Sequence, residues 1–277
     1  MADNRPIGVF DSGLGGLTVL KELEKVLPGE SFVYFGDTGR VPYGSRSNDT
    51  IISYAKQDEN FLLSKNVKYI VAACGTVSAV AANTAKDLPV KFMGVVENSV
   101  KVAVNATKNN KIGVIGTSAT INNGAHKRKI LELLPTAEVT TADCPLFVPL
   151  VEEGFSADDD VVVLEVARRY LAPMLKAGVD TLILGCTHYP ILQGAIRKIM
   201  GKNVTLINMG NSTALAVKQD LTELDMLSNA ESVVANEFYV SDITAGFAKV
   251  SEILLGEKIC DVNLVDINKY DGSFNRN

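Results

Sequence analysis

Two short stretches of the sequence, Ile70-Val-Ala-Ala-Cys-Gly-Thr76 and Leu182-Ile-Leu-Gly-Cys-Thr-His188, each place one cysteine and one threonine at the end of an apolar run. A short apolar run that ends in turn residues is typical of a buried strand. Two thiols in matching contexts indicate a duplicated fold in which the cysteines face each other. A reaction that needs an acid and a base on opposite faces of one carbon atom uses such a pair.

Similar apolar runs recur along the chain, each followed by a turn and a segment of helical periodicity. The runs are continuous rather than alternating, which predicts strands that are buried on both faces. The expected strands are Ile7–Phe10, Phe32–Phe35, Tyr69–Ala73, Val90–Val96, Ile112–Ile115, Thr181–Leu184 and Val204–Ile207. The expected helices include Gly16–Val26, Thr50–Ser64, Asp160–Ala177 and Ser212–Leu221. This alternation predicts an α/β fold with parallel sheets covered by helices.

A weak internal repeat predicts two related domains. The tripeptide Ile7-Gly-Val9 recurs as Ile112-Gly-Val114, and the two cysteine stretches are separated by nearly the same offset. We therefore expect two α/β domains related by a pseudo-two-fold axis. Residues 1–98 plus 208–277 would form the domain with the first cysteine, and residues 99–207 the domain with the second. In open parallel sheets ligands bind beyond the carboxyl ends of the strands, which places the active site in the cleft between the domains.

Composition and charge narrow the class of protein. The chain has 277 residues, 47% of them hydrophobic, which suffices for one large core or two smaller ones. Its four cysteines are scattered without CxxC spacing, which predicts free thiols and a cytoplasmic location. The N-terminus lacks the pattern of a secretory signal, and no apolar run reaches the roughly 18 residues of a membrane span. We therefore expect no membrane association.

The net charge of −5 and the dispersed basic residues are not typical of nucleic-acid binding. An acidic protein still binds a small anion, because backbone N–H groups at helix starts supply local positive potential. The sequence thus predicts a small-molecule partner and no nucleic acid. It leaves the oligomeric state open, with a homodimer as the candidate.

A glycine-rich stretch, Asp11-Ser-Gly-Leu-Gly-Gly16, follows the first expected strand. Its N–H groups are suited to hold a carboxylate or a phosphate. The spacing matches neither GxGxxG nor GxxxxGK[ST], so it predicts no dinucleotide or P-loop site. The alternative is that Asp11 or Ser12 only caps the first helix.

Cys74 and Cys186 each stand where a strand is followed by a helix, a position that favours a thiolate and suits a base. For either thiol alone, a buried structural cysteine is the alternative. A threonine follows each cysteine closely, Thr76 in one stretch and Thr187 in the other. This shared context disfavours the interpretation that both cysteines are only structural. His188 is suited to assist proton transfer, since an imidazole ordinarily titrates near pH 6.5. A zinc site from both cysteines and His188 is a further alternative, although no tight ligand spacing supports it.

Other polar stretches are less informative. Gly36-Asp-Thr-Gly-Arg-Val-Pro-Tyr-Gly44 has the composition of a surface loop, and Gly116-Thr-Ser-Ala-Thr120 that of a turn with a helix cap. Glu152 follows an apolar segment, which predicts either a half-buried or a solvated carboxylate. His126 lies in a basic helical stretch and is expected on the solvated surface.

Taken in order, these stretches resemble the glutamate racemases of the cofactor-independent aspartate/glutamate racemase superfamily. The resemblance spans almost the whole chain and implies two flavodoxin-like domains. It also implies interconversion of L- and D-glutamate for peptidoglycan synthesis without pyridoxal phosphate or metal. The stretches that carry it are Phe10-Asp-Ser-Gly-Leu-Gly-Gly16, Gly36-Asp-Thr38, Pro42-Tyr-Gly44, Ala73-Cys-Gly-Thr76, Gly116-Thr117 with Thr120, Pro149-Leu-Val-Glu152 and Gly185-Cys-Thr-His-Tyr-Pro190.

The resemblance also implies residue roles. Cys74 would deprotonate D-glutamate with help from Asp11, and Cys186 would deprotonate L-glutamate with help from His188. Glu152 would be a further participant. The positions that match the family's substrate-binding positions are Asp11, Ser12, Pro42, Tyr43, Gly44, Gly75, Thr76, Thr117, Thr120, Thr187 and His188.

The sequence departs from the family at two positions. Glycine stands at position 75, where the family has Asn, which predicts a missing side-chain contact and tighter substrate binding when Asn is restored. Near Ile207-Asn-Met-Gly210 the family commonly shows an Asp, and we expect a structural role there.

Three alternatives remain open at this point. An aspartate racemase or related decarboxylase would share the fold. A non-catalytic amino-acid-binding protein would share the cleft without needing two thiols. A cysteine hydrolase would use one thiol and leave the other idle.

Overall fold

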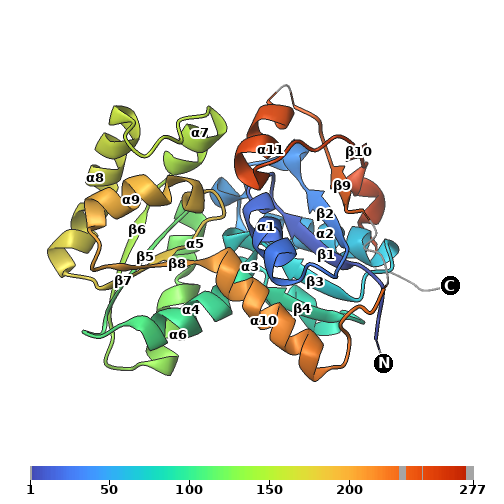
Figure 1. Cartoon of the computed structure of the whole chain (residues 1–277), viewed down its shortest axis with the longest axis horizontal. Helices are drawn as coiled ribbons and strands as arrows, with labels where there is room; N and C mark the ends of the chain where they lie inside the picture. The colour runs from blue at the N-terminus through green and yellow to red at the C-terminus, as the bar shows by residue number, and fades with distance from the viewer. Residues whose placement is uncertain (1, 231–234, 245, 273–277) are drawn as a thin grey trace.

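The structure is a computed structural model that describes residues 2–230, 235–244 and 246–272 (Figure 1). All strand pairs in this part of the chain are parallel. The strands are β1 Ile7–Asp11, β2 Phe32–Gly36, β3 Tyr69–Ala72, β4 Lys91–Gly94, β5 Lys111–Gly116, β6 Glu138–Asp143, β7 Thr181–Leu184, β8 Thr205–Asn208, β9 Glu237–Val240 and β10 Asn263–Leu264.

Helices connect and cover the strands (Figure 1). The α-helices are α1 Leu17–Val26, α2 Asn48–Ser64, α3 Gly75–Val80, α4 Val95–Ala106, α5 Ser118–Asn123, α6 Ala125–Leu133, α7 Phe147–Glu152, α8 Val161–Ala177, α9 Gln193–Met200, α10 Met209–Glu223 and α11 Phe247–Leu255. The 3-10 helices are η1 Thr38–Arg40, η2 Tyr43–Ser45, η3 Thr84–Asp87, η4 Tyr189–Leu192 and η5 Ile267–Tyr270.

The two sheets repeat one topology, as the internal sequence repeat predicts. One sheet has the order β10-β9-β2-β1-β3-β4 and the other β6-β5-β7-β8. The order β2-β1-β3-β4 thus recurs as β6-β5-β7-β8, so that β3 and β7 occupy equivalent places. The predicted α/β fold with parallel sheets is confirmed. We propose that the two domains, 1–98 plus 208–277 and 99–207, correspond to these sheets.

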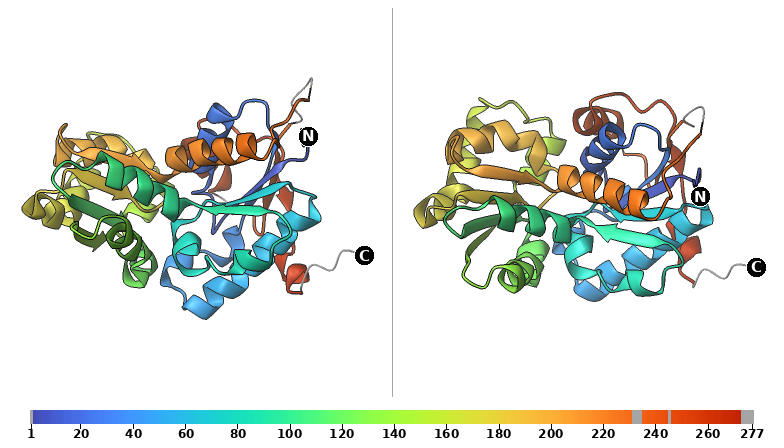
Figure 2. Two further views of the ribbon diagram at one scale, coloured as in Figure 1. Left: turned by 90° about the horizontal axis from the view of Figure 1, so that it is seen from below. Right: turned by 60° about the horizontal axis from the view of Figure 1, so that its bottom comes forward.

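The chain crosses between the sheets twice, through α4 after β4 and through α10 after β8. The two connecting helices pack against each other where the lobes meet, α4 mainly on the lobe of β7 and β8 and α10 against α1 of the other lobe (Figure 2). Asn208, at the departure from the family near β8, accepts a hydrogen bond from the Gly210 amide at 2.8 Å. This bond caps the start of α10 and confirms the expected structural role.

The strands that the sequence did not predict lie toward the sheet edges. β6 and β10 are edge strands, and β9 pairs between β2 and β10. Their side chains are mostly half-buried or exposed and include polar residues, so the continuous apolar signal of a central strand is missing. The predicted strand Val90–Val96 is too long, because α4 begins at Val95, whose amide donates to the Ser78 hydroxyl at 3.1 Å.

The expected surface position of His126 is wrong. Its side chain is 2% exposed, and burial lowers its pKa to about 4. Gly124 has a φ of 71° and joins α5 to α6, a left-handed turn that glycine adopts without strain. The reversal lets the N-terminal turn of α6 pack inward, although its sequence is basic. Among the described helices, none combines the length and apolar character needed to cross a bilayer.

Candidate active site

A cavity of about 470 Å³ lies at the carboxyl ends of the central strands of both sheets. The segments that line it follow β1, β3, β5 and β7, with the loop after β2 and part of α7 closing it. This placement is the one expected for ligands of open parallel sheets. The lining residues are Ser12, Gly13, Val41, Pro42, Tyr43, Gly44, Ser45, Cys74, Gly75, Thr76, Thr117, Ser118, Pro145, Val148, Pro149, Glu152, Gly185, Cys186, Thr187 and His188.

Cys74 ends β3 and precedes α3, on the side of the six-stranded sheet. Its thiol is buried and donates to the Ser12 hydroxyl at 3.4 Å. Burial and the charge of Asp11 raise the pKa of Cys74 to about 12, against the opposing effects of Ser12 and the Val77 amide. At neutral pH this sulfur therefore carries its proton and is suited to donate it.

Cys186 occupies the equivalent place after β7, on the other side of the cavity. Its Sγ lies 3.9 Å from Nδ1 of His188, and Nε2 of the same ring lies 3.0 Å from Oε1 of Glu152. Burial opposes protonation of His188 most strongly, but contacts with Cys186 and Glu152 together raise its pKa to about 10. The resulting imidazolium stabilises negative charge on the Cys186 sulfur. Glu152 is exposed, with 44% of its side chain accessible to solvent.

Asp11 lies behind the cavity wall rather than on it. Its carboxylate is buried, and Oδ2 accepts a hydrogen bond from the Gly13 amide at 3.0 Å. Its other oxygen is buried without a hydrogen-bond partner among the described residues. Burial raises the pKa of Asp11, while the charge of His188 and the amides of Gly13 and Gly16 oppose that rise. The alternative that Asp11 or Ser12 caps the first helix is wrong, since α1 begins after Gly16 without a side-chain cap.

The glycine-rich stretch brings the two halves of the site into contact. A Cβ at Gly15 would lie 2.2 Å from the Thr187 hydroxyl and 2.6 Å from the His188 ring. Thr18, in the first turn of α1, donates to the Thr187 carbonyl oxygen at 2.8 Å. Glycine at position 15 therefore allows the loop after β1 to approach the loop after β7, which a larger residue would prevent.

Three threonine hydroxyls form a chain at one end of the cavity. Thr76 lies 3.0 Å from Thr117, and Thr117 lies 3.0 Å from Thr120. Thr117 also accepts from the Thr120 amide, which confirms the expected helix cap at the start of α5. Thr120 is buried and does not line the cavity. It orients the other two hydroxyls, and its own contact with a substrate stays a prediction.

The loop after β2 is only partly buried: Asp37, Thr38 and Tyr43 are buried, whereas Gly39, Val41 and Pro42 are exposed. Pro42, Tyr43 and Gly44 line the cavity, and Tyr43 is 1% exposed. The Tyr43 hydroxyl donates to Asp37 and, at 3.2 Å, to Asp58. Its hydrogen-bonding capacity is thus used within the protein. A Cβ at Gly44 would lie 3.0 Å from Thr117, so this loop also touches the opposite lobe.

Gly75 leaves no room for the side chain that the family carries. An ideal Cβ at this position would lie 2.5 Å from the Gly185 carbonyl oxygen and 3.2 Å from the Met209 methyl group. A side chain at position 75 would require the Gly185 backbone to shift, and the expected gain of a substrate contact with Asn stays a prediction. Glycine here permits close approach of the two cysteine-bearing segments.

Several lining residues escaped sequence analysis. They are Gly13, Val41, Ser45, Ser118, Pro145, Val148, Pro149 and Gly185. Most lie beside residues that the motifs did identify, and the prolines and Val148 form an apolar wall that carries no chemical signal. The described lining includes no Lys or Arg, which leaves backbone N–H groups, hydroxyls and the His188 imidazolium as its donors for an anionic ligand. Within the described ranges, no three His, Cys, Asp or Glu side chains converge to hold a metal, which gives the zinc alternative no support.

Comparisons with known proteins agree with this geometry. The sequence profile of the Asp/Glu/Hydantoin racemase family matches residues 20–219. The glutamate racemase of Geobacter metallireducens is 43% identical over 264 residues, covering 95% of this chain and 97% of that protein. The glutamate racemase of Thermoanaerobacter pseudethanolicus is 44% identical over 268 residues, covering 97% of this chain and all of that protein.

The crystal structure of the Francisella tularensis glutamate racemase, solved in complex with D-glutamate, superimposes with a TM-score of 0.89. It is 39% identical and covers 97% of this chain and 100% of the other. The family profile, the full-length relatives and the superimposed structure all indicate the same family. The chain therefore belongs to the Asp/Glu/Hydantoin racemase family, among its glutamate racemases, and is an amino-acid racemase.

Proposed function

We propose that the protein interconverts L- and D-glutamate by moving the Cα proton between two cysteine sulfurs. The observation that carries the proposal is the placement of Cys74 and Cys186 at equivalent strand ends on one cavity. Inversion of a carbon centre requires removal of a proton from one face and delivery of another to the opposite face. One thiolate and one thiol on opposite walls meet that requirement in both directions.

In the L-to-D direction, the Cys186 thiolate takes the Cα proton and the bonding pair stays on the substrate as a carbanion. The Cys74 thiol then delivers its proton to the opposite face. The buried Cys74 thiol, which carries its proton, and the His188 imidazolium beside the Cys186 sulfur support this direction. The His188 contact with Glu152 keeps the ring charged and oriented.

In the D-to-L direction, Cys74 must first lose its proton and Cys186 must gain one, which the His188 imidazolium beside it supplies. Asp11 is the buried carboxyl whose charge acts on this sulfur, and its own raised pKa suits it to take up a proton. Asp11 therefore assists Cys74, while His188 and Glu152 assist Cys186. Both sulfurs return to their starting states by proton exchange after product release.

Substrate binding relies on fixed donors rather than on a basic side chain. The hydroxyls of Ser12, Thr76, Thr117 and Thr187 and the backbone of the loop after β2 surround the cavity. Several fixed donors orient a dianionic amino acid as well as neutralise it. The mechanism also needs reduced sulfur, and the described cysteines are free, so we place the enzyme in the cytoplasm, supplying D-glutamate for peptidoglycan synthesis. A homodimer stays a prediction.

Hydrogen exchange at Cα tests this function directly. The protein is incubated in heavy water with L-glutamate, D-glutamate, L-aspartate or D-aspartate, and deuterium at Cα is followed by NMR together with optical rotation. We expect deuterium incorporation and loss of optical activity with both glutamates. Activity on aspartate alone would favour the aspartate racemase alternative, and no exchange with any substrate would favour a binding protein.

A further inference from the structure

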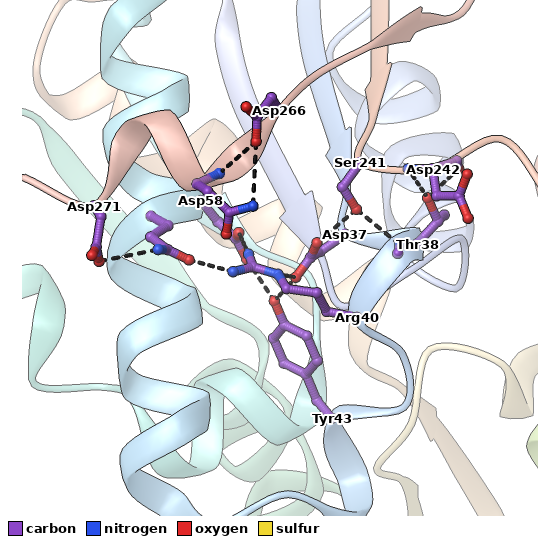
Figure 3. A network of polar contacts seen from close by, with 12 residues as sticks. Asp37, Thr38, Arg40, Tyr43, Asp58, Ser241, Asp242, Asp266 and Asp271 are labelled. Carbon is purple, nitrogen blue, oxygen red and sulfur yellow. Dashed lines mark hydrogen bonds and ion pairs between the residues drawn. The ribbon is translucent and has the colours of Figure 1, made fainter.

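The hydroxyl of Tyr43 enters a buried polar cluster beside the cavity (Figure 3). It donates to Oδ2 of Asp37 and lies 3.2 Å from Oδ2 of Asp58. Both carboxyl groups are 0% exposed. Tyr43 thus joins the cavity wall to two buried acids, and its orientation depends on them.

One guanidinium organises these acids. Nε of Arg40 lies 2.6 Å from Oδ2 of Asp37, and Nη2 lies 3.2 Å from Oδ1 of Asp58. The same group lies 3.9 Å from the centre of the Tyr54 ring. A buried ion pair that loses one partner leaves an uncompensated charge, which is strongly unfavourable. The geometry of Arg40 and Asp37 is therefore tightly constrained.

The two acids are not equivalent. Burial and the charge of Asp37 raise the pKa of Asp58 well above that of an ordinary carboxyl group. A single guanidinium also balances only one negative charge. The shift favours the protonated form of Asp58, while Asp37 makes the shorter ion pair with Arg40. A neutral amide at position 58 would preserve this charge state, whereas one at position 37 would not.

The C-terminal segment completes the cluster. Ser241, which follows β9, donates to the free oxygen of Asp37 at 2.7 Å and accepts from the Gly39 amide at 2.8 Å. Both oxygens of Asp37 are therefore held, one by Ser241 and the other by Arg40 and Tyr43. Strand β9, nearly two hundred residues further along the chain, thus helps to hold the loop after β2.

On its other side, this loop meets the opposite lobe of the molecule. Gly44 packs against Thr117, which lies 3.0 Å from Thr76 beside the first thiol. Residues 42–44 are therefore enclosed between the buried cluster and a cavity wall that belongs to the other sheet. A shift of the cluster would move the backbone N–H groups of the loop relative to a bound substrate.

We propose that Asp37 and Arg40 are positioning residues of the racemisation site, which hold the loop of residues 42–44 in its substrate-binding place through the Tyr43 hydroxyl. The inference rests on the proposed function, because the loop is taken to hold the carboxylates of glutamate. These contacts exist before and during proton transfer. Their weakening therefore raises KM more than it lowers kcat.

The test compares Tyr43→Phe and Asp37→Asn with two controls. Asp58→Asn changes the acid that lies farther from the Tyr43 hydroxyl and keeps an oxygen there that accepts a hydrogen bond. Tyr69→Phe removes another buried tyrosine hydroxyl, which donates to Asp220 at 2.7 Å and lies outside the cavity lining. Kinetic constants are measured with L- and D-glutamate, and thermal unfolding is followed by circular dichroism.

We expect Tyr43→Phe and Asp37→Asn to raise KM about tenfold or more, the effect of losing a hydrogen bond to a charged group, with kcat close to that of the wild type. Asp58→Asn and Tyr69→Phe should keep the wild-type KM, even if Tyr69→Phe lowers the unfolding temperature. The double variant Tyr43→Phe/Asp37→Asn should raise KM no further than Asp37→Asn alone, because both changes break the same bond.

Two results would overturn the inference. One is a wild-type KM in Tyr43→Phe, once its circular dichroism shows that this variant is folded. The other is an equal rise of KM in Tyr69→Phe, which would reduce the cluster to a general stabilising role. A wild-type protein that exchanges no deuterium into glutamate would instead overturn the proposed function, and the inference with it.

Discussion

Gly75 lies directly against the backbone carbonyl of Gly185, so that an ideal Cβ on Gly75 would come within 2.5 Å of that oxygen. Each glycine is the direct neighbour of a catalytic candidate, Cys74 on one side and Cys186 on the other. The contact therefore sets how closely the two thiol-bearing segments approach. The atom that a side chain at position 75 would meet is backbone, so the Gly185 segment rather than a flexible side chain would have to move.

Substitution of Gly75 should impair racemisation. We expect Gly75→Ala and Gly75→Asn to lower kcat/KM by up to about 100-fold, the effect of a 1 Å misplacement of reacting groups. Because the two enantiomers have equal free energies, kcat/KM must fall equally in both directions. Gly29→Ala is the matched control, since a Cβ there meets nothing within 4 Å. A lower KM in Gly75→Asn would show instead that the segments separate easily and that the amide gains a substrate contact.

Replacement of either thiol should leave an enzyme that removes the Cα proton from one enantiomer only. Serine has a far higher pKa than cysteine and is a poor base at neutral pH, so Cys74→Ser and Cys186→Ser should each lose racemisation. With a β-substituted glutamate, the remaining thiolate still removes the Cα proton while the β-substituent leaves with the bonding pair. Cys74→Ser should process the L enantiomer and Cys186→Ser the D enantiomer, as measured by release of the leaving group.

The exposed Cys260 provides the control for these variants, and Cys260→Ser should keep full activity. If Cys74→Ser and Cys186→Ser acted on the same enantiomer, or either still racemised at the wild-type rate, one cysteine would be structural. The two-base assignment would then be wrong.

The chain has two histidines, and their pKa values should be shifted in opposite directions from the ordinary value of an imidazole. Burial lowers the pKa of His126 to about 4, while contacts with Cys186 and Glu152 raise that of His188 to about 10. NMR titration of ¹⁵N-histidine protein, assigned with His126→Asn and His188→Asn, should therefore show no imidazole titrating near pH 6.5. A signal that titrates at that pH and disappears in His188→Asn would show that His188 has an ordinary pKa. The imidazolium proposed to stabilise the Cys186 thiolate would then be ruled out.

The same shift predicts a pH dependence of stability. The folded-state pKa of His188 is above its unfolded value of about 6.5, so protonation of His188 stabilises the folded protein fully below that pH. This contribution is lost as the pH rises from about 6.5 through about 10. Urea unfolding between pH 6 and 10 should show a steeper loss of stability in the wild type than in His188→Asn. Parallel curves would contradict the raised pKa.

Asp11→Asn and His188→Asn should affect the two directions unequally, because each side chain acts mainly on one sulfur. We expect the separate kcat and KM values for L- and D-glutamate to change differently in the two variants, while kcat/KM falls equally in both directions. Full progress curves from each enantiomer measure all four constants. Wild-type constants in both variants would mean that neither side chain assists a thiol.

The central strands and the residues at their ends could be predicted from the amino-acid pattern alone. A strand covered on both faces must be apolar throughout, so β1, β2, β3, β5 and β7 appear as continuous apolar runs. The repeat of these runs also predicted the pairing of Cys74 with Cys186. Most of the cavity lining followed, because the ends of neighbouring parallel strands meet at one edge of a sheet.

Features that depend on contacts between residues far apart in the chain could not be predicted from local patterns and became visible only in the folded protein. The edge strands carry no periodic signal, and the burial of His126 depends on how α6 packs. The bond from Ser241 to Asp37 joins residues that local patterns cannot relate. The same holds for Gly75, whose lack of space arises from a carbonyl more than a hundred residues away. A sequence pattern reports the periodicity of one segment, whereas close packing is set by which segments come together.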